Sequence, residues 1–269
     1  MSKPVILVTN DDGLLSPGLH AAIEAVQSLG EVVVAAPVQQ QSGMGRSLPA
    51  FFPCTVTEHR LKLGDGEMFA YGVDGSPAQA VLQGILSLCE GPPALVVAGV
   101  NHGENLGTSS MVSGTVGAAL QAAVMGVPGL AVSLEVPPDF HFDAQSGDAI
   151  DWTAAIHFTR YFAERMLLRA IPADVDVLKI DIPSSATKGT PWRVTRQARQ
   201  PYYHSANVPE ELTLGIPRRL PYYVHIDWDV LPRDSDIWAF ARDRVVSVTP
   251  LSIDMTSRVD LSTLETLLA

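Results

Sequence analysis

Near its start the chain reads Val5-Ile6-Leu7-Val8-Thr9-Asn10-Asp11-Asp12-Gly13. A short apolar run rich in β-branched residues predicts a buried parallel strand. Ligands of open α/β sheets bind beyond the carboxyl ends of the strands, so Asp11 and Asp12 are expected at a site. Two adjacent carboxylates repel unless a cation lies between them, and hard oxygen ligands favour Mg²⁺, Mn²⁺ or Ca²⁺ over zinc. Alternatively, Asp11 or Asp12 only caps the next helix and Gly13 makes the turn.

Composition predicts a soluble cytoplasmic protein. With 269 residues, 46% of them hydrophobic, the chain can bury about three quarters of its unfolded surface without disulfides. Cys54 and Cys89 form no CxxC motif, which indicates a reducing compartment. The start lacks a signal-peptide pattern, and every apolar stretch is shorter than the roughly 18 residues of a membrane span. A net charge of −11 argues against nonspecific nucleic-acid binding.

Alternating strand and helix patterns predict a single α/β domain over residues 1–269. Besides the first strand, we expect buried strands at 31–36, 94–99, 129–134 and 175–182, helices at 19–26, about 77–88, 114–125 and 151–169, and a hairpin at 55–71. Strands separated by helices indicate a doubly wound, mostly parallel, Rossmann-like sheet with right-handed crossovers.

A protruding hairpin arm is expected at about 190–230. Extended segments at 192–196 and 222–226 are joined there by a long polar stretch. Tyr202, Tyr203, Tyr222 and Tyr223 would leave aromatic surface exposed on a lone subunit, and an isolated two-stranded arm cannot bury both of its faces. We therefore expect the arm to pack on another copy of the chain.

Polar loops follow two more of the predicted strands and complete a candidate metal site. Ser42-Gly43 lies in the loop after the second strand, and Asn101 follows the strand that ends at Gly99. Their hydroxyl and amide oxygens, with Asp11 and Asp12, would bind a hard cation and leave positions for water and substrate. Each residue alone has an ordinary explanation as a turn or loop residue.

A second anion-binding feature is the helix start at Ser113-Gly114-Thr115. Free backbone N–H groups and two hydroxyls at the positive end of a helix dipole suit a phosphate. An ordinary Ser N-cap with small residues for close packing is the alternative.

Other phosphate and nucleophile motifs are missing from the sequence. No dinucleotide fingerprint, P-loop or nucleophile elbow is present, and Gly13 stands where an aspartyl-phosphate enzyme would carry its second Asp. Direct attack by metal-activated water is favoured. His102, directly after Asn101, is a candidate proton donor or phosphate contact, or a loop histidine without a function.

Taken together, the motifs closely resemble the SurE family of survival proteins. The resemblance is carried, in order, by Asn10-Asp11-Asp12-Gly13, Ala36-Pro37 with Ser42-Gly43, Gly99-Val100-Asn101-His102-Gly103-Glu104-Asn105-Leu106-Gly107, Ser113-Gly114-Thr115-Val116 and Val246-Ser247-Val248-Thr249-Pro250-Leu251. Family members usually have Ser at the position of Ala98, a basic residue at Gln41 and Tyr at Val112. These departures bear on substrate preference and rate.

The resemblance implies a metal-dependent 5′/3′-nucleotidase that forms a homodimer or homotetramer. It assigns one divalent cation per subunit to Asp11, Asp12, Ser42 and Asn101, with Mg²⁺ or Mn²⁺ as the metal and Ca²⁺ also able to occupy the site. It places Asn10, Gly43, His102, Asn105, Ser113, Gly114 and Thr115 near a nucleoside monophosphate, and it extends the substrates of some members to short polyphosphate. We expect Asp11 or Asp12 to orient the attacking water. The competing hypothesis is a non-catalytic stress protein that binds nucleotide or polyphosphate on the same scaffold.

Overall fold

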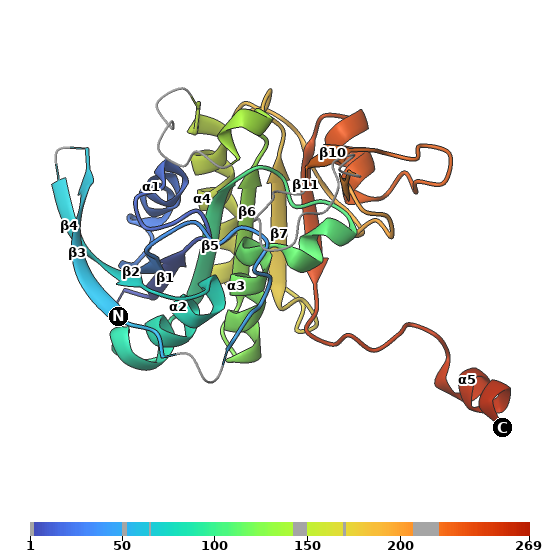
Figure 1. Cartoon of the computed structure of the whole chain (residues 1–269), viewed down its shortest axis with the longest axis horizontal. Helices are drawn as coiled ribbons and strands as arrows, with labels where there is room; N and C mark the ends of the chain where they lie inside the picture. The colour runs from blue at the N-terminus through green and yellow to red at the C-terminus, as the bar shows by residue number, and fades with distance from the viewer. Residues whose placement is uncertain (1–2, 50–52, 65, 142–149, 169–170, 207–220) are drawn as a thin grey trace, which may run out of the picture.

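A nine-stranded sheet forms the centre of the protein (Figure 1). The computed structural model describes residues 3–49, 53–64, 66–141, 150–168, 171–206 and 221–269. The sheet order is β3-β4-β2-β1-β5-β6-β7-β11-β8. These strands are β1 (Val5–Thr9), β2 (Glu31–Pro37), β3 (Val56–Leu63), β4 (Gly66–Val73), β5 (Leu95–His102), β6 (Gly129–Leu134), β7 (Val177–Ile182), β8 (Trp192–Val194) and β11 (Val246–Leu251). From β4 to β7 all neighbours are parallel, which confirms the expected doubly wound sheet.

Helices cover both faces of this sheet. α1 (Pro17–Val26) and α4 (Thr153–Leu167) pack on one face, and α2 (Pro77–Gln83) and α3 (Gly114–Val124) pack on the other. Two apolar clusters result, one on each side of the sheet, and strand residues of β1, β5 and β6 alternate between them. Because both faces of the sheet are buried, the sequences of its central strands are nearly continuous apolar runs.

The strand order reverses beside β1. From β1 the chain moves to β2 on one side and later returns to β5 on the other, so β1 and β5 flank a topological switch point. Such points leave a crevice beyond the carboxyl ends of the strands, because the connections leave in opposite directions. The loops that follow β1, β2 and β5 therefore meet at one edge of the sheet, as the sequence predicts.

Two elements differ in extent from their sequence predictions. The predicted helix at 77–88 is α2 followed by a π-helical turn, η1 (Gly84–Leu88), where a Cβ on Gly84 would lie 2.6 Å from Leu7 Cδ2. β5 continues to His102 after a register shift between Ala98 and Asn101, so Asn101 lies in a strand and pairs with Ser133 of β6. The apolar run ends at Val100, which is why the sequence pattern places the strand end too early.

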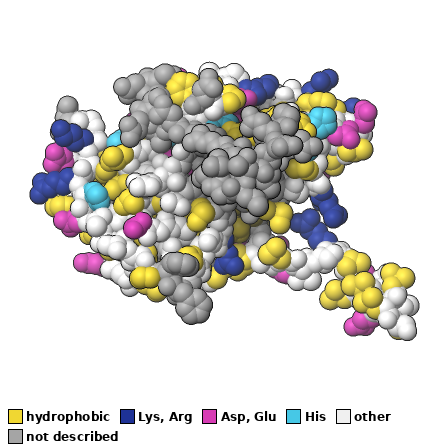
Figure 2. All heavy atoms as spheres, in the orientation of Figure 1, with side chains coloured by type: hydrophobic (Ala, Val, Ile, Leu, Met, Phe, Trp, Pro, Cys, Tyr) yellow, Lys and Arg dark blue, Asp and Glu magenta, His cyan; other side chains and the backbone are white. Residues whose placement is uncertain are grey.

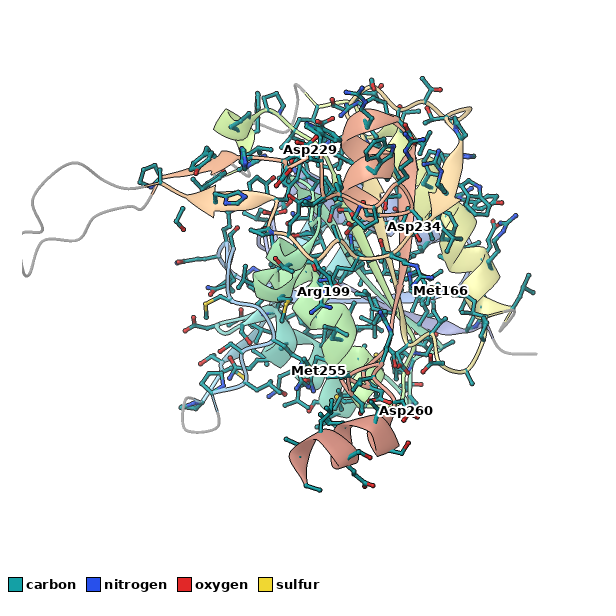
Figure 3. All side chains as sticks on the ribbon, turned by 90° about the vertical axis from the view of Figure 1, so that its right-hand side faces the viewer. Met166, Arg199, Asp229, Asp234, Met255 and Asp260 are labelled. Atoms are coloured by element: carbon teal, nitrogen blue, oxygen red, sulfur yellow. The ribbon has the colours of Figure 1, made fainter. Side chains whose placement is uncertain are left out.

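The predicted hairpin arm is present, but one of its strands is different. It consists of β9 (Tyr203–Ser205) and β10 (Tyr222–Val224), which pair antiparallel and project from the body (Figure 3). The segment at 192–196, predicted as the partner of 222–226, instead provides β8 and pairs with β11 in the main sheet. Short extended segments carry no pattern that specifies their partner. The connection at 207–220 lies outside the described residues.

The C-terminal tail extends away from the body. After β11 the chain runs to α5 (Leu261–Leu268), which stands apart from the sheet (Figure 1) and begins just after Asp260, labelled in Figure 3. No residue of α5 is buried. In the described part of the chain, every helix is too short or too polar to cross a lipid bilayer.

Candidate active site

A cavity of about 320 Å³ opens at the switch point of the sheet. Its wall combines the loops after β1, β2 and β5, the start of α3 and the β9–β10 hairpin. The lining residues are Asp11, Ser42, Gly43, Asn101, His102, Gly103, Glu104, Asn105, Ser109, Val112, Ser113, His141, Tyr203, His204, Ser205 and Tyr222. Seven of the residues singled out from the sequence are among them, whereas Asn10, Asp12, Gly114 and Thr115 lie behind this wall.

Asp11 is a buried carboxylate in the cavity wall. Only 3% of its surface is exposed, and the Thr115 hydroxyl donates a hydrogen bond to its Oδ1. The same hydroxyl lies 3.2 Å from Asn101 Oδ1, so Thr115 links two of the predicted metal ligands. Burial, reinforced by the neighbouring Asp12 carboxylate, raises the pKa of Asp11 to about 7. A carboxylate in this position favours either a proton or a cation.

Gly114 allows this close approach of α3 to Asp11. A Cβ on Gly114 would lie 2.7 Å from both the Cβ and the Oδ2 of Asp11. Real Cβ atoms do not approach other atoms so closely, so any larger residue would push Asp11 aside. The sequence interpretation placed Gly114 beside the phosphate, and the structure shows that it also sets the position of Asp11.

We expect Gly114→Ala to lower turnover about 100-fold, because a displacement of about 1 Å at a reacting centre has this effect. The control is Gly66→Ala, where the added Cβ would meet only Leu63 O at 3.6 Å. Steady-state phosphate release from both variants measures the effect. Equal rates for Gly114→Ala and the wild type would show that Asp11 tolerates displacement.

Asp12 is held in a hydrogen-bonded network instead of facing the cavity. The His102 backbone N–H donates to Asp12 Oδ2 over 3.0 Å, and His102 Nδ1 lies 2.9 Å from the same oxygen. Gln40 Nε2 donates to Asp12 Oδ1 over 3.0 Å. His102 is only 4% exposed and packs edge-on against Trp152. Its main contacts therefore fix Asp12, although part of the ring lines the cavity.

Gln40 is a site residue that the sequence interpretation missed. Its Nε2 lies 3.1 Å from Ser42 Oγ and 2.7 Å from the carbonyl oxygen of His141. Together with its contact to Asp12, this amide joins the loops after β1 and β2 to the segment after β6. No local pattern marks Gln40, because three neighbouring glutamines look alike until the loop is folded.

Asn10 and Asn105 stabilise the backbone of their loops. The Asn10 side chain exchanges hydrogen bonds with Gly13, donating to its O over 2.9 Å and accepting from its N over 3.3 Å. Asn105 Nδ2 donates to Ser133 Oγ over 2.8 Å. Both asparagines stay predictions as substrate-binding residues, and of the two only Asn105 reaches the cavity.

Ser113 is the N-cap that one of the two alternatives predicted, and its phosphate role stays a prediction. It is the N-cap of α3, because its Oγ accepts from Val116 N over 3.1 Å, and it also lines the cavity. The helix therefore begins at the cavity wall, beside Asp11. Backbone amides in this position attract anions.

The cavity wall also contains aromatic rings and a buried acid. Tyr203 and Tyr222 pack edge to face with ring centroids 5.2 Å apart, and Tyr222 OH lies 2.7 Å from His141 Nδ1. Tyr203 OH donates to Glu104 Oε1 over 2.8 Å. The sequence analysis did not select Glu104 or His141, and it assigned both tyrosines to a subunit interface.

The expectation of exposed tyrosines is wrong for the first pair of the arm. Tyr202 is 6% exposed and belongs to a small apolar cluster with Leu106 and Phe240, and Tyr203 is only partly exposed. Ser109 Oγ accepts from the backbone N–H groups of both residues over 3.0 Å, which holds β9 against the cavity wall. The chain itself thus provides a partner for these rings.

Glu104 makes the stability of the fold depend on pH. Burial raises its pKa to about 7, and Oε2 has no hydrogen-bond partner among the described residues. Since the folded pKa is above the ordinary 4.5, the folded state binds the Glu104 proton more tightly. This contribution to stability is present below pH 4.5 and is lost as the pH rises through 7.

The free energy of unfolding of the wild type should fall between pH 5 and pH 8 as Glu104 ionises. We expect Glu104→Gln to make this fall smaller by roughly 1–3 kcal/mol. Urea unfolding at several pH values measures this difference, and Glu58→Gln, at an exposed position, is the matched control. Parallel pH profiles for the wild type and Glu104→Gln would contradict the prediction.

Fold and site define an α/β protein of the Rossmann-like, doubly wound class, with carboxylate, hydroxyl and amide oxygens and a helix start at its switch point. The sequence model of the family "Survival protein SurE" matches residues 6–204. The chain belongs to the SurE family. The expectation drawn from the motifs is thereby confirmed.

Relatives with known names resemble the chain over nearly its whole length. A "5′-nucleotidase SurE" of Thermococcus gammatolerans is 42% identical over 271 residues, covering 98% of this chain and 95% of its own length. One of Methanothrix thermoacetophila is 40% identical over 269 residues and covers 98% of each chain. The crystal structure of the SurE protein from Aquifex aeolicus superposes with a TM-score of 0.73 at 29% identity, covering 99% of this chain and all of that one.

Proposed function

We propose that this protein is a divalent-metal-dependent phosphomonoesterase that hydrolyses nucleoside 5′-monophosphates to nucleoside and phosphate. The observation that carries this proposal is the cavity itself, whose wall combines carboxylate, hydroxyl and amide oxygens and a helix start with two tyrosine rings. A phosphate suits the oxygens and the helix start, and a nucleoside suits the tyrosine rings. The names of the relatives support the same activity.

The donor set fits a hard cation. Asp11, Ser42 and Asn101 present carboxylate, hydroxyl and amide oxygens at the cavity, and Asp12 lies directly behind Asp11. Among the described residues no group of three His, Cys, Asp or Glu side chains is placed to bind a metal, so the site would rely on neutral oxygens too. One Mg²⁺ or Mn²⁺ per subunit would neutralise phosphate charge and lower the pKa of a bound water.

The side chains of the chain have distinct proposed tasks. Thr115 orients Asp11 and Asn101, and the network of Gln40 and His102 fixes Asp12. The start of α3 at Ser113 binds the phosphate oxygens that remain free. Asp11 lines the cavity whereas Asp12 does not, so we assign the orientation of the attacking water to Asp11.

A phosphate-release assay tests the proposed function directly. We expect turnover of nucleoside 5′-monophosphates with added Mg²⁺ or Mn²⁺, and 3′-monophosphates and short polyphosphate are assayed in parallel. The competing hypothesis, a non-catalytic nucleotide-binding protein, predicts binding of the same nucleotides by calorimetry without phosphate release. That result would refute the enzyme.

For the quaternary structure we propose a homodimer or homotetramer. Besides the β9–β10 hairpin, the tail offers an apolar surface on α5, where Leu261, Leu264, Leu267 and Leu268 are exposed (Figure 2). No residue of α5 is buried against the described part of the chain, and a short unpacked helix is marginal in water, so we propose a second copy as its partner. Sedimentation of the intact chain at micromolar concentration should show an oligomer, and a monomer would refute this proposal.

A further inference from the structure

A fully buried ionic triad lies behind the cavity wall. It consists of Lys179 and Asp181 of β7 and Asp236, which precedes η5 (Trp238–Arg242), and all three are 0% exposed. Lys179 Nζ donates to Asp181 Oδ2 and lies 3.2 Å from Asp236 Oδ2. Lysine and aspartate are almost never fully buried unless they are paired.

The other bonds of Lys179 and Asp181, and one oxygen of Asp236, contact the backbone of the site loop, whereas Asp236 Oδ1 accepts from the backbone N–H groups of Ala198 and Ile237. Lys179 Nζ donates to Asn105 O over 2.7 Å, and Asn105 N donates to Asp181 Oδ1 over 2.7 Å. Gly107 N donates to Asp236 Oδ2 over 3.0 Å. Residues 105 and 107 are thus held by all three members of the triad.

This loop needs such support, because it has no regular structure of its own. It runs from the end of β5 at His102 to η2 (Thr108–Val112) and contains Gly103 and Gly107, both with positive φ. The strand end and loop together carry the cavity residues Asn101, His102, Glu104 and Asn105. The hydrogen bonds at Asn105 and Gly107 therefore restrict the later half of the loop, whereas β5 holds its beginning.

We propose that Lys179, Asp181 and Asp236 are positioning residues, which hold the loop so that Asn101 stays in place for the metal. This inference rests on the proposed function only in taking Asn101 as a ligand. The ionic character matters because one ammonium group placed between two carboxylates lets the triad bridge three separate segments. Outer partners of metal ligands typically affect metal affinity 10- to 100-fold.

The test is Lys179→Met, which keeps an unbranched side chain, one atom shorter, and leaves two buried carboxylates unpaired. We expect its Mn²⁺ affinity, measured by calorimetry on nucleotide-free protein, to fall at least about tenfold. We also expect faster hydrogen exchange at the amides of Asn105 and Gly107. Both readouts are independent of turnover.

Rescue and control variants separate positioning from general destabilisation. Lys179→Met/Asp181→Asn removes one unpaired charge and keeps an acceptor for Asn105 N, so its Mn²⁺ affinity should return to within about threefold of the wild type. Ile180→Ala, on the opposite face of the same strand, weakens the core but should leave Mn²⁺ affinity unchanged.

Two results would overturn the proposal. One is a folded Lys179→Met with wild-type Mn²⁺ affinity and amide exchange, and the other is an equal loss of affinity in Ile180→Ala. If Lys179→Met does not fold, Asp181→Asn replaces it, and unchanged exchange at Asn105 and Gly107 would then refute the idea. A wild type that binds Mn²⁺ but releases no phosphate would refute the enzyme and leave the positioning role intact.

Discussion

Asp11→Asn should lower phosphate release by at least about 1,000-fold while the fold stays intact, because the change removes a ligand charge from the cavity wall and not from the core. Without metal, the variant should be at least as stable as the wild type at pH 8. The pKa of Asp11 is raised to about 7, so the fold opposes its ionised form, and an amide carries no charge.

Asp12→Asn and Asp74→Asn are informative comparisons for this variant. Asp12 accepts hydrogen bonds on both of its carboxylate oxygens. The NH₂ group of an asparagine at this position would face one of these donors, which should lower the free energy of unfolding by roughly 1–3 kcal/mol. Asp74 is exposed and should tolerate the change. Urea unfolding in a chelator and phosphate-release rates measure all three variants. An active Asp11→Asn would move the chemistry elsewhere.

Removal of divalent metal should abolish activity in the wild type. We expect phosphate release to fall at least about 100-fold after exhaustive chelation and to return with Mg²⁺ or Mn²⁺, because no Lys or Arg side chain lines the cavity in the described residues to replace the charge. The cation should also raise the melting temperature, since it binds the folded state and relieves the repulsion between Asp11 and Asp12.

Metal analysis of the chelated sample is the control for this experiment. Full activity in protein shown to be metal-free would refute the metal-dependent mechanism. An increase in melting temperature without recovery of activity would favour the competing hypothesis of a binding protein, because the metal would then occupy the site without supporting turnover.

Much of the site could be predicted because its signals are local in sequence. Three local patterns mark where an element ends or begins. They are the apolar run before Asp11, the small residues of the helix start at Ser113 and the polar residues after Val100. Parallel strands with helical crossovers must place such ends at one edge of the sheet. The meeting of Asp11, Ser42, Asn101 and Ser113 at one cavity follows from these local patterns.

The sequence by itself thus determined the sheet class, the edge that carries the site and the meeting of Asp11, Ser42 and Asn101 at one cavity. Only the tertiary structure decided which strand pairs with β10, that Tyr203 and Tyr222 face the cavity, and that the triad of Lys179, Asp181 and Asp236 supports the loop. The reason is physical. Hydrophobic periodicity is encoded within a few residues, whereas these contacts join segments tens of residues apart, and their side chains acquire partners only when the chain has folded.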